Sequence, residues 1–99
     1  MNPIRHDLKT LDRYYDAIVD GRKTFEVRLN DRAFQTGDII RLRKVNDKGY
    51  YVDYILAWTE RRITYVLQGG QFGIEPRYCV LGLAPVPEPS PETKGARDA

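Results

Sequence analysis

The sequence predicts a small α+β domain that is mainly β, with one early helix beside a curled sheet. Apolar residues recur once at helical spacing, and several short segments alternate apolar and polar residues between turns. The 99 residues suffice for one domain, and 41% hydrophobic with 30% charged residues is typical of a globular protein. A small mixed barrel capped by the helix and an open α+β sandwich both fit this pattern.

The helix is predicted over residues 11–19. Thr10 is a plausible N-cap, Asp12 lies favourably in the first turn, and Gly21 supplies the C-terminal stop. Apolar side chains recur with a period of 3.6 residues and form one face, made of Leu11, Tyr14, Tyr15, Ile18 and Val19.

Six strands are predicted, over residues 4–8, 24–29, 39–43, 50–55, 62–67 and 78–83. Turn residues at 36–38 and a loop with a late glycine at 46–49 separate three of them. Successive side chains of a strand point to opposite faces. In the second strand we therefore expect Phe25, Val27 and Leu29 to face the core, and Glu26 and Arg28 to project from the other face.

The sequence changes character from Pro85 onward, where prolines alternate with Val, Glu or Ser. Proline removes backbone donors and fixes φ, which is typical of an extended segment outside a packed core. We expect a domain over residues 1–85 and a disordered, Pro-rich tail over residues 86–99.

Several classes of protein are excluded. No apolar run reaches the roughly 18 residues of a membrane span, and residues 1–7 lack the apolar stretch of a signal peptide. Cys79 is the sole cysteine, which excludes an intrachain disulfide, and its apolar strand predicts a buried, inert thiol. We therefore expect a cytoplasmic protein without a membrane partner.

The residues present also exclude several kinds of binding site and catalytic group. The sole histidine and the lack of a spaced Asp/Glu cluster predict no metal site. No Gly-rich phosphate loop is present, and the sole serine, Ser90, lies in the tail, which excludes a serine nucleophile in the domain. The formal charge of +2 is too small for a protein that holds duplex DNA by bulk electrostatics.

Three ionisable residues gather where the predicted helix gives way to a strand. Glu26 and Arg28 stand two residues apart, so their side chains share one face. Lys23 lies near the helix C-terminus, whose carbonyls favour a cation. Two cations around one carboxylate can hold a phosphate while Glu26 accepts a hydrogen bond from a base or sugar. The alternative is an exposed ion pair on the outer face of the strand.

Further candidates for ligand binding lie on other predicted strands. A histidine would add a titratable donor, and same-face arginines can follow a phosphate backbone. Trp58 stands near Arg61 and Arg62, an aromatic and basic combination that suits nucleic acid. The other candidate binding residues are His6, Lys9, Arg41 and Arg43.

The pattern Gly21-x-Lys23-x-x-Glu26-x-Arg28 resembles the motif of ASCH domains, a branch of the PUA-like superfamily. Residues 4–84 resemble more closely an uncharacterised ASCH-like family of small bacterial and phage proteins, above all at 6–9, 23–32, 34–38, 63–67 and 78–83. The resemblance implies a PUA-like mixed β-barrel with one N-terminal helix beside a cleft. It also implies that Lys23, Glu26 and Arg28 line the cleft and bind RNA or a nucleotide-like ligand. We expect no cofactor.

Two other functions stay open. Some small ASCH relatives are amidohydrolases that remove the acetyl group of N4-acetylcytidine with a Lys, a Thr and a later Glu. Lys23 corresponds to their lysine, but Glu26 aligns with their threonine, and a carboxylate cannot replace a hydroxyl nucleophile without a change of mechanism. In a hydrolase, Thr24 would take the place of that threonine, or Glu26 would serve as a general base instead. Glu60 or Glu75 would then be the later glutamate.

The third possible function is that of a phage or mobile-element accessory protein that binds another protein. Of the three, we expect binding of RNA or a nucleotide rather than catalysis.

Overall fold

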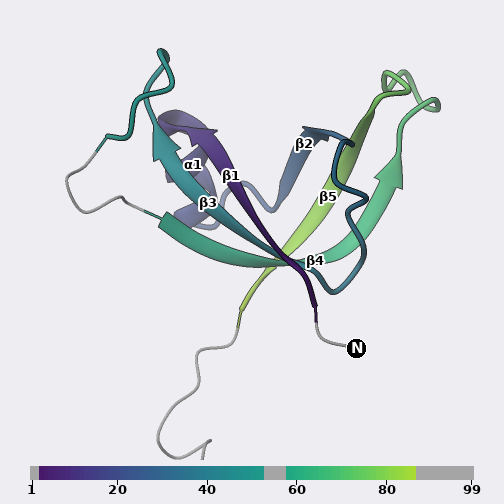
Figure 1. The fold of residues 1–99 in the computed structure, drawn as a ribbon, viewed down its shortest axis with the longest axis horizontal. Coiled ribbons are helices and arrows are strands. Elements are labelled where there is room, and N and C mark those ends of the chain that lie inside the picture. The colour runs from purple at the N-terminus through teal and green to yellow at the C-terminus, as the bar shows by residue number, and fades with distance from the viewer. Residues whose placement is uncertain (1–2, 53–57, 87–99) are drawn as a thin grey trace, which may run out of the picture.

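The computed structural model describes residues 3–52 and 58–86, which form one curled five-stranded sheet with a helix against it (Figure 1). In chain order the elements are β1 (Arg5–Leu11), α1 (Asp12–Val19), β2 (Phe25–Leu29), β3 (Ile39–Val45), β4 (Trp58–Gln68) and β5 (Tyr78–Pro85). The strand order is β1-β3-β4-β5-β2, so β1 and β2 are the two edges. The predicted α+β, mainly β fold is confirmed, in the form of a PUA-like half-barrel.

The long strand β4 bends the sheet, because it pairs with different neighbours along its length. Its residues 58–62 pair with β3 and its residues 61–68 pair with β5. A register shift between Ile63 and Tyr65 marks a β-bulge, which bends a strand and increases its twist. The two halves of the sheet therefore rise from β4 like the arms of a V (Figure 1).

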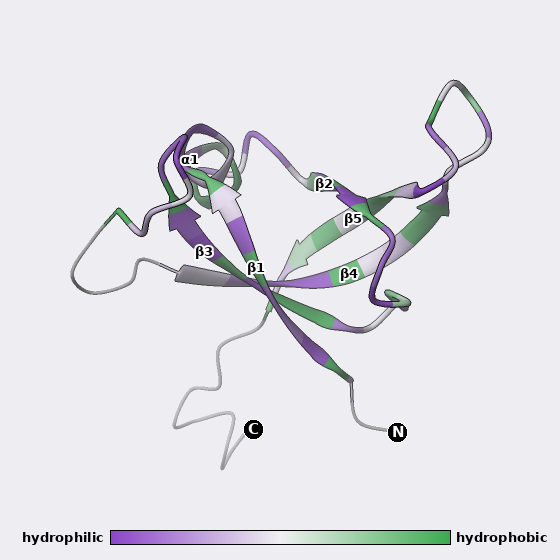
Figure 2. Cartoon of the chain, turned by 45° about the horizontal axis from the view of Figure 1, so that its top comes forward, coloured by the Kyte–Doolittle hydropathy of each residue, from purple (hydrophilic) through white to green (hydrophobic). Residues whose placement is uncertain are grey.

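The core lies on the inner face of this curl, where α1 packs against β1 and β3. Tyr15 and Ile18 are the buried residues of the helix. Figure 2 shows that β5 is largely hydrophobic, and its alternate side chains Cys79, Leu81 and Leu83 are buried in this core. Gly21 adopts a φ of 87°, which favours glycine and ends the helix as predicted. Within the described part of the chain, no helix has the length and apolar character needed to cross a membrane.

A buried polar pair fixes the start of β1 beside β3. The Nε2 atom of His6 lies 2.9 Å from Oδ2 of Asp38, and both side chains are 8% exposed. The backbone N–H groups of Ile4 and Gln35 also donate to the Asp38 carboxylate. The ring of His6 packs edge-on against Phe34. Because a buried carboxylate is costly without donors, these contacts specify how the two strands meet.

The predicted N-cap of the helix is wrong. Thr10 lies in β1, where the backbone is extended because β1 pairs with β3 as far as Leu11 and Val45. The helix begins at Asp12 with Leu11 at the N-cap position and no side-chain cap. Its predicted apolar face is also narrower than expected, since Tyr14 and Val19 are exposed.

The strand predicted over residues 50–55 is not formed in its described part. Tyr51 makes an isolated bridge with Val45, and Tyr50 and Tyr51 are both exposed, so no buried face holds a longer strand there. Residues 53–55 lie outside the described residues. So does the predicted tail from residue 87 onward.

The orientation predicted for β2 is reversed. Glu26 is 5% exposed, whereas Phe25, Val27 and Leu29 are 45%, 52% and 43% exposed. Register explains this, because Glu26 and Arg28 lie opposite the buried Leu81 and Cys79 of β5. The charged face of β2 thus points into the curl of the sheet, and its apolar face points out.

Candidate functional site

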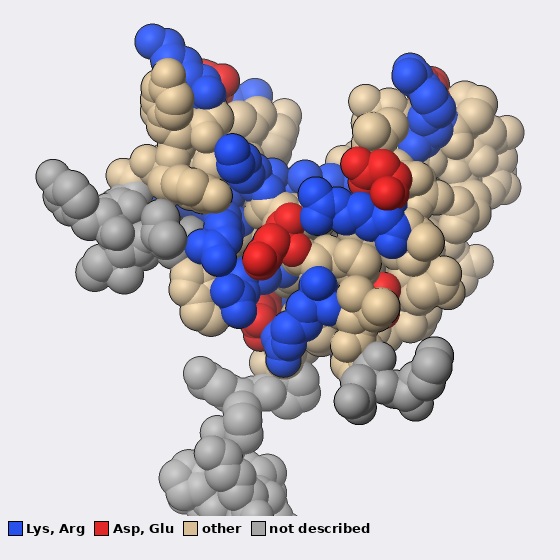
Figure 3. Space-filling view, viewed as in Figure 1, with Lys and Arg blue, Asp and Glu red and all other residues tan. Residues whose placement is uncertain are grey.

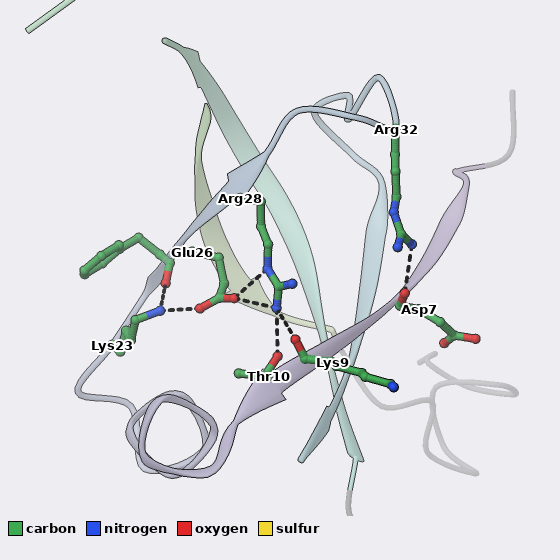
Figure 4. Close-up of polar contacts among 8 residues, drawn as sticks. Asp7, Lys9, Thr10, Lys23, Glu26, Arg28 and Arg32 are labelled. Atoms are coloured by element: carbon green, nitrogen blue, oxygen red, sulfur yellow. Dashed lines mark hydrogen bonds and ion pairs between the residues drawn. The ribbon is translucent and has the colours of Figure 1, made fainter. Parts of the chain in front are cut away.

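The two edge strands face each other across a seam that the sheet leaves open, and arginine side chains from the β2 side span it. Arg28 donates from Nη2 to the backbone carbonyl of Lys9 at 2.8 Å and to Oγ1 of Thr10 at 3.0 Å. Arg32, just after β2, donates from Nη1 to the carbonyl of Asp7 at 2.8 Å. Figure 4 shows both arginines reaching from β2 and its following loop to β1. Side chains therefore join the two edges where backbone pairing is missing.

A three-residue cluster lies at this seam. The Nζ of Lys23 donates to Oε1 of Glu26, and the Nε of Arg28 donates to Oε2 of the same carboxylate at 3.0 Å (Figure 4). The side chains of Lys23, Glu26 and Arg28 are 16%, 6% and 21% exposed. The exposed ion pair considered above is therefore wrong, because Glu26 is buried between its two cations. A buried charge needs such partners, and here the carboxylate fixes where both cations point.

A pocket of about 620 Å³ opens beside the cluster, between β1, the start of α1 and β2. Lys9, Thr10, Lys23, Glu26 and Arg28 form its polar wall. Its apolar wall includes the rings of Tyr14, Phe25 and Tyr78. Small-molecule sites commonly combine an apolar wall with a few fixed polar groups.

Aromatic rings also flank the lysine of the cluster. The Nζ of Lys23 lies 4.8 Å from the ring centre of Phe25 and 5.4 Å from that of Tyr14. The same Nζ donates to the carbonyl of Phe25 at 2.7 Å. The hydrogen bonds to Glu26 and to the Phe25 carbonyl use two of the three N–H donors of Lys23. The Nη1 of Arg28 makes no hydrogen bond within the described residues. The pocket thus offers free N–H donors with positive charge next to rings, which suits an anion attached to a planar group.

The structure brings together only some of the predicted site residues. Lys9, Lys23, Glu26 and Arg28 line the pocket, whereas His6 is buried against Asp38 and Phe34 away from it. Arg41 and Arg43 lie on the outer face of β3, which turns away from α1.

The groups proposed for hydrolysis are dispersed. Thr24 precedes β2 and is not part of the pocket wall. Glu60 lies on the outer face of β4 and pairs with Arg5, and Glu75 pairs with Arg77 in the turn before β5. Burial raises the pKa of the Cys79 thiol, and Asp31 raises it further. Among residues 3–52 and 58–86, no three His, Cys, Asp or Glu side chains gather as a metal site.

Sequence reasoning missed Thr10, Tyr14 and Tyr78 as neighbours of the cluster. Thr10 and Tyr14 were assigned to the helix cap and the helix core, although both line the pocket. In the structure His6, Leu8 and Thr10 are the buried positions of this strand, and their spacing of two in the sequence is a signal that the first strand runs past residue 8.

Residues 5–83 match the family described as "Domain of unknown function (DUF3850)". The chain belongs to the DUF3850 family. This DUF3850 chain is also similar to N(4)-acetylcytidine amidohydrolases of Escherichia coli, among them those of strains K12 / DH10B, SMS-3-5 / SECEC and SE11. Each is 36% identical to it over 47 residues, or 46% of each chain. The similarity thus spans less than half the length of these curated relatives.

Proposed function

We propose that this DUF3850 domain is of the ASCH type and binds a nucleotide, free or within RNA, in the pocket at the open seam. The observation that carries this is the buried Glu26 carboxylate, which holds Lys23 and Arg28 at the wall of the pocket. Lys23 and Arg28 bind the phosphate, and the neighbouring rings contact the base.

Physical chemistry supports these roles. Phosphate prefers charge-assisted hydrogen bonds from Lys and Arg, which are stronger than neutral ones. Bases stack on aromatic side chains, and the ring centres of Tyr14 and Phe25 lie 5.4 Å and 4.8 Å from the Lys23 ammonium. Glu26 already accepts from both cations, so its main role is to orient them. The partial similarity to enzymes named for a modified nucleoside supports a nucleotide-related ligand.

Binding by matched variants tests the proposal. Wild type and three variants, Lys23→Ala, Arg28→Lys and Arg22→Ala, are titrated with nucleoside monophosphates and short single-stranded RNA. Lys23→Ala should weaken binding by about 1–3 kcal/mol, the contribution of a charge-assisted hydrogen bond. Arg28→Lys keeps the charge but loses the planar fork, and should also weaken it.

Arg22→Ala is the control. Its guanidinium is exposed, pairs with Asp20 and lies outside the pocket wall, so the same loss of charge should leave affinity nearly unchanged. Equal weakening by Lys23→Ala and Arg22→Ala would refute the pocket as the binding site, as would the absence of any binding by the wild type.

A second candidate function is hydrolysis of an acetylated nucleoside, favoured by the 47-residue similarity to the N(4)-acetylcytidine amidohydrolases. Water would add to the acetyl carbonyl, the C–N bond to the base would break, and acetate and cytidine would leave. Lys23 would assist, with Glu26 as the base.

Incubation with N4-acetylcytidine and detection of free cytidine decides this point. Release by wild type that is abolished in Lys23→Ala and retained in Arg22→Ala would establish the hydrolase. Binding of N4-acetylcytidine without release of cytidine would mean that the domain binds the nucleoside but does not hydrolyse it.

A further inference from the structure

We propose that the ligand of the pocket is one unit of a single-stranded polynucleotide whose chain continues over the outer face of β1, β3 and β4. The surface consists of Lys9, Arg43 and Trp58, here called the outer row. This inference rests on the proposed function, and it adds the class of ligand and a second contact surface.

Strand register builds the outer row. Lys9 of β1 lies opposite Arg43 of β3, and Arg43 lies opposite Trp58 of β4. Residues opposite one another in a sheet project from the same face, and neighbouring strands are about 4.8 Å apart. The three side chains thus form a continuous line across the sheet. Lys9 also lines the pocket, so the row begins where the pocket ends.

The charges of this face are not equivalent. Arg41, next to the row, has its guanidinium 3.6 Å from the Asp7 carboxylate and 3.8 Å from that of Glu60. Arg43 makes no hydrogen bond or ion pair with any described residue. A guanidinium without a partner among the described residues can donate to a phosphate without first breaking an ion pair with any of them. Arg43 is therefore the phosphate-binding cation of the row, and Arg41 is held by its acidic neighbours.

Aromatic groups accompany these cations. The Arg41 guanidinium lies 4.7 Å from the ring centre of Trp58, which it helps to hold in place, while Trp58 remains 49% exposed. The Nζ of Lys9 lies 5.6 Å from the ring of Tyr51, which is 45% exposed. Cations interleaved with exposed rings are the usual means of holding single strands, because every base has a face that stacks.

The overall charge pattern favours a single strand over a duplex. Figure 3 shows Lys and Arg side chains gathered along the middle of the molecule, with Asp and Glu among them. The whole chain carries a formal charge of only +2. A ligand that relies on a few phosphates and on base stacking fits this pattern better than one held by many phosphates.

Affinity as a function of ligand length tests the inference. Wild type, Arg43→Gln and Trp58→Ala are titrated with a cytidine monophosphate and with single-stranded RNAs of two, four and eight nucleotides, and with an RNA duplex. Wild-type affinity should rise with length up to about four nucleotides, and the duplex should bind more weakly than a single strand of equal length. Arg43→Gln and Trp58→Ala should each lower affinity for the eight-nucleotide strand about tenfold, and for the monophosphate less than twofold.

Arg77→Gln is the matched control, because it removes an exposed charge from the turn before β5, away from the row. It should bind all ligands as wild type does. The inference is overturned if affinity is independent of length, if the duplex binds best, or if Arg43→Gln behaves as Arg77→Gln does. Those outcomes would leave the proposed pocket standing. Failure of the proposed function would instead appear in its own test, as a Lys23→Ala variant that binds the monophosphate as tightly as wild type does.

Discussion

The guanidinium of Arg28 on one edge strand donates a 2.8 Å hydrogen bond to the backbone carbonyl of Lys9 on the other. The same guanidinium holds the Glu26 carboxylate and the Thr10 hydroxyl. One side chain therefore both bridges the open seam of the half-barrel and shapes the wall of the pocket. The same residue thus links the stability of the fold to the proposed ligand site.

Replacement of Arg28 should destabilise the fold. Arg28→Ala removes the bridge to β1 and leaves Glu26 with one cation, so we expect the free energy of unfolding to fall by about 1–3 kcal/mol. Urea denaturation followed by circular dichroism measures this. Arg77→Ala serves as the control and should unfold like wild type. Equal stability of Arg28→Ala and wild type would show that the bridge contributes nothing to the fold.

The orientation of β2 predicts a small loss of stability on mutation of Phe25 and a large loss on mutation of Leu81, which lies opposite Glu26 on β5. Phe25 is 45% exposed, so Phe25→Ala should cost less than about 1 kcal/mol, whereas Leu81→Ala, at a fully buried position, should cost about 2–5 kcal/mol. Denaturation of the two variants side by side tests the orientation of the strand. A loss in Phe25→Ala as large as that in Leu81→Ala would mean that Phe25 is in the core after all.

The β2 strand also shows how far the sequence could predict this fold. Its alternation was sufficient to predict a strand and to place Glu26 and Arg28 on one face, and the structure confirms both points. Alternation does not say which face is buried, and hydrophobicity favoured the wrong one. The partners that make burial of Glu26 tolerable are Lys23 and Arg28, and Arg28 is held in turn by Thr10 and the Lys9 carbonyl. Contacts over 18 or 19 residues of chain leave no local pattern.

The same reason explains the error at Thr10. A threonine before an acidic first turn is typical of a helix N-cap. Here the parallel pairing with β3 keeps the backbone extended through Leu11, and the hydroxyl of Thr10 is used by Arg28 instead. Tertiary pairing outweighs the local preference at that junction.

Acid should weaken the protein through Asp38. Burial raises the pKa of Asp38, but the hydrogen bond from His6 and those from the N–H groups of Ile4 and Gln35 outweigh this effect, so the pKa of Asp38 lies below its usual value of 3.8. A lowered pKa in the folded state means that the stabilisation is complete above the unfolded pKa and is lost as pH falls through the folded one. Denaturation of wild type and Asp38→Asn between pH 6 and pH 2 tests this. Wild type should lose more stability below about pH 4 than the variant, and parallel losses would contradict the assignment.

The Cys79 thiol should react slowly. It is fully buried, and both burial and the nearby Asp31 raise its pKa, which lowers the fraction of thiolate. A thiol-reactive dye should label the native protein much more slowly than the protein in denaturant. Labelling at equal rates in the two states would show that the strand opens readily or that the thiol is accessible.

The central proposal is that the pocket at the seam binds a nucleotide, and an NMR titration tests it most directly. The 15N-labelled protein is titrated with a nucleoside monophosphate while its backbone amide signals are followed. We expect the largest shifts at Thr10, Lys23, Glu26 and Arg28, with little change at Gln35 and Gly37, which precede β3 and lie outside the pocket wall. Shifts confined to residues outside the pocket wall, or no shifts at millimolar ligand, would contradict the proposal.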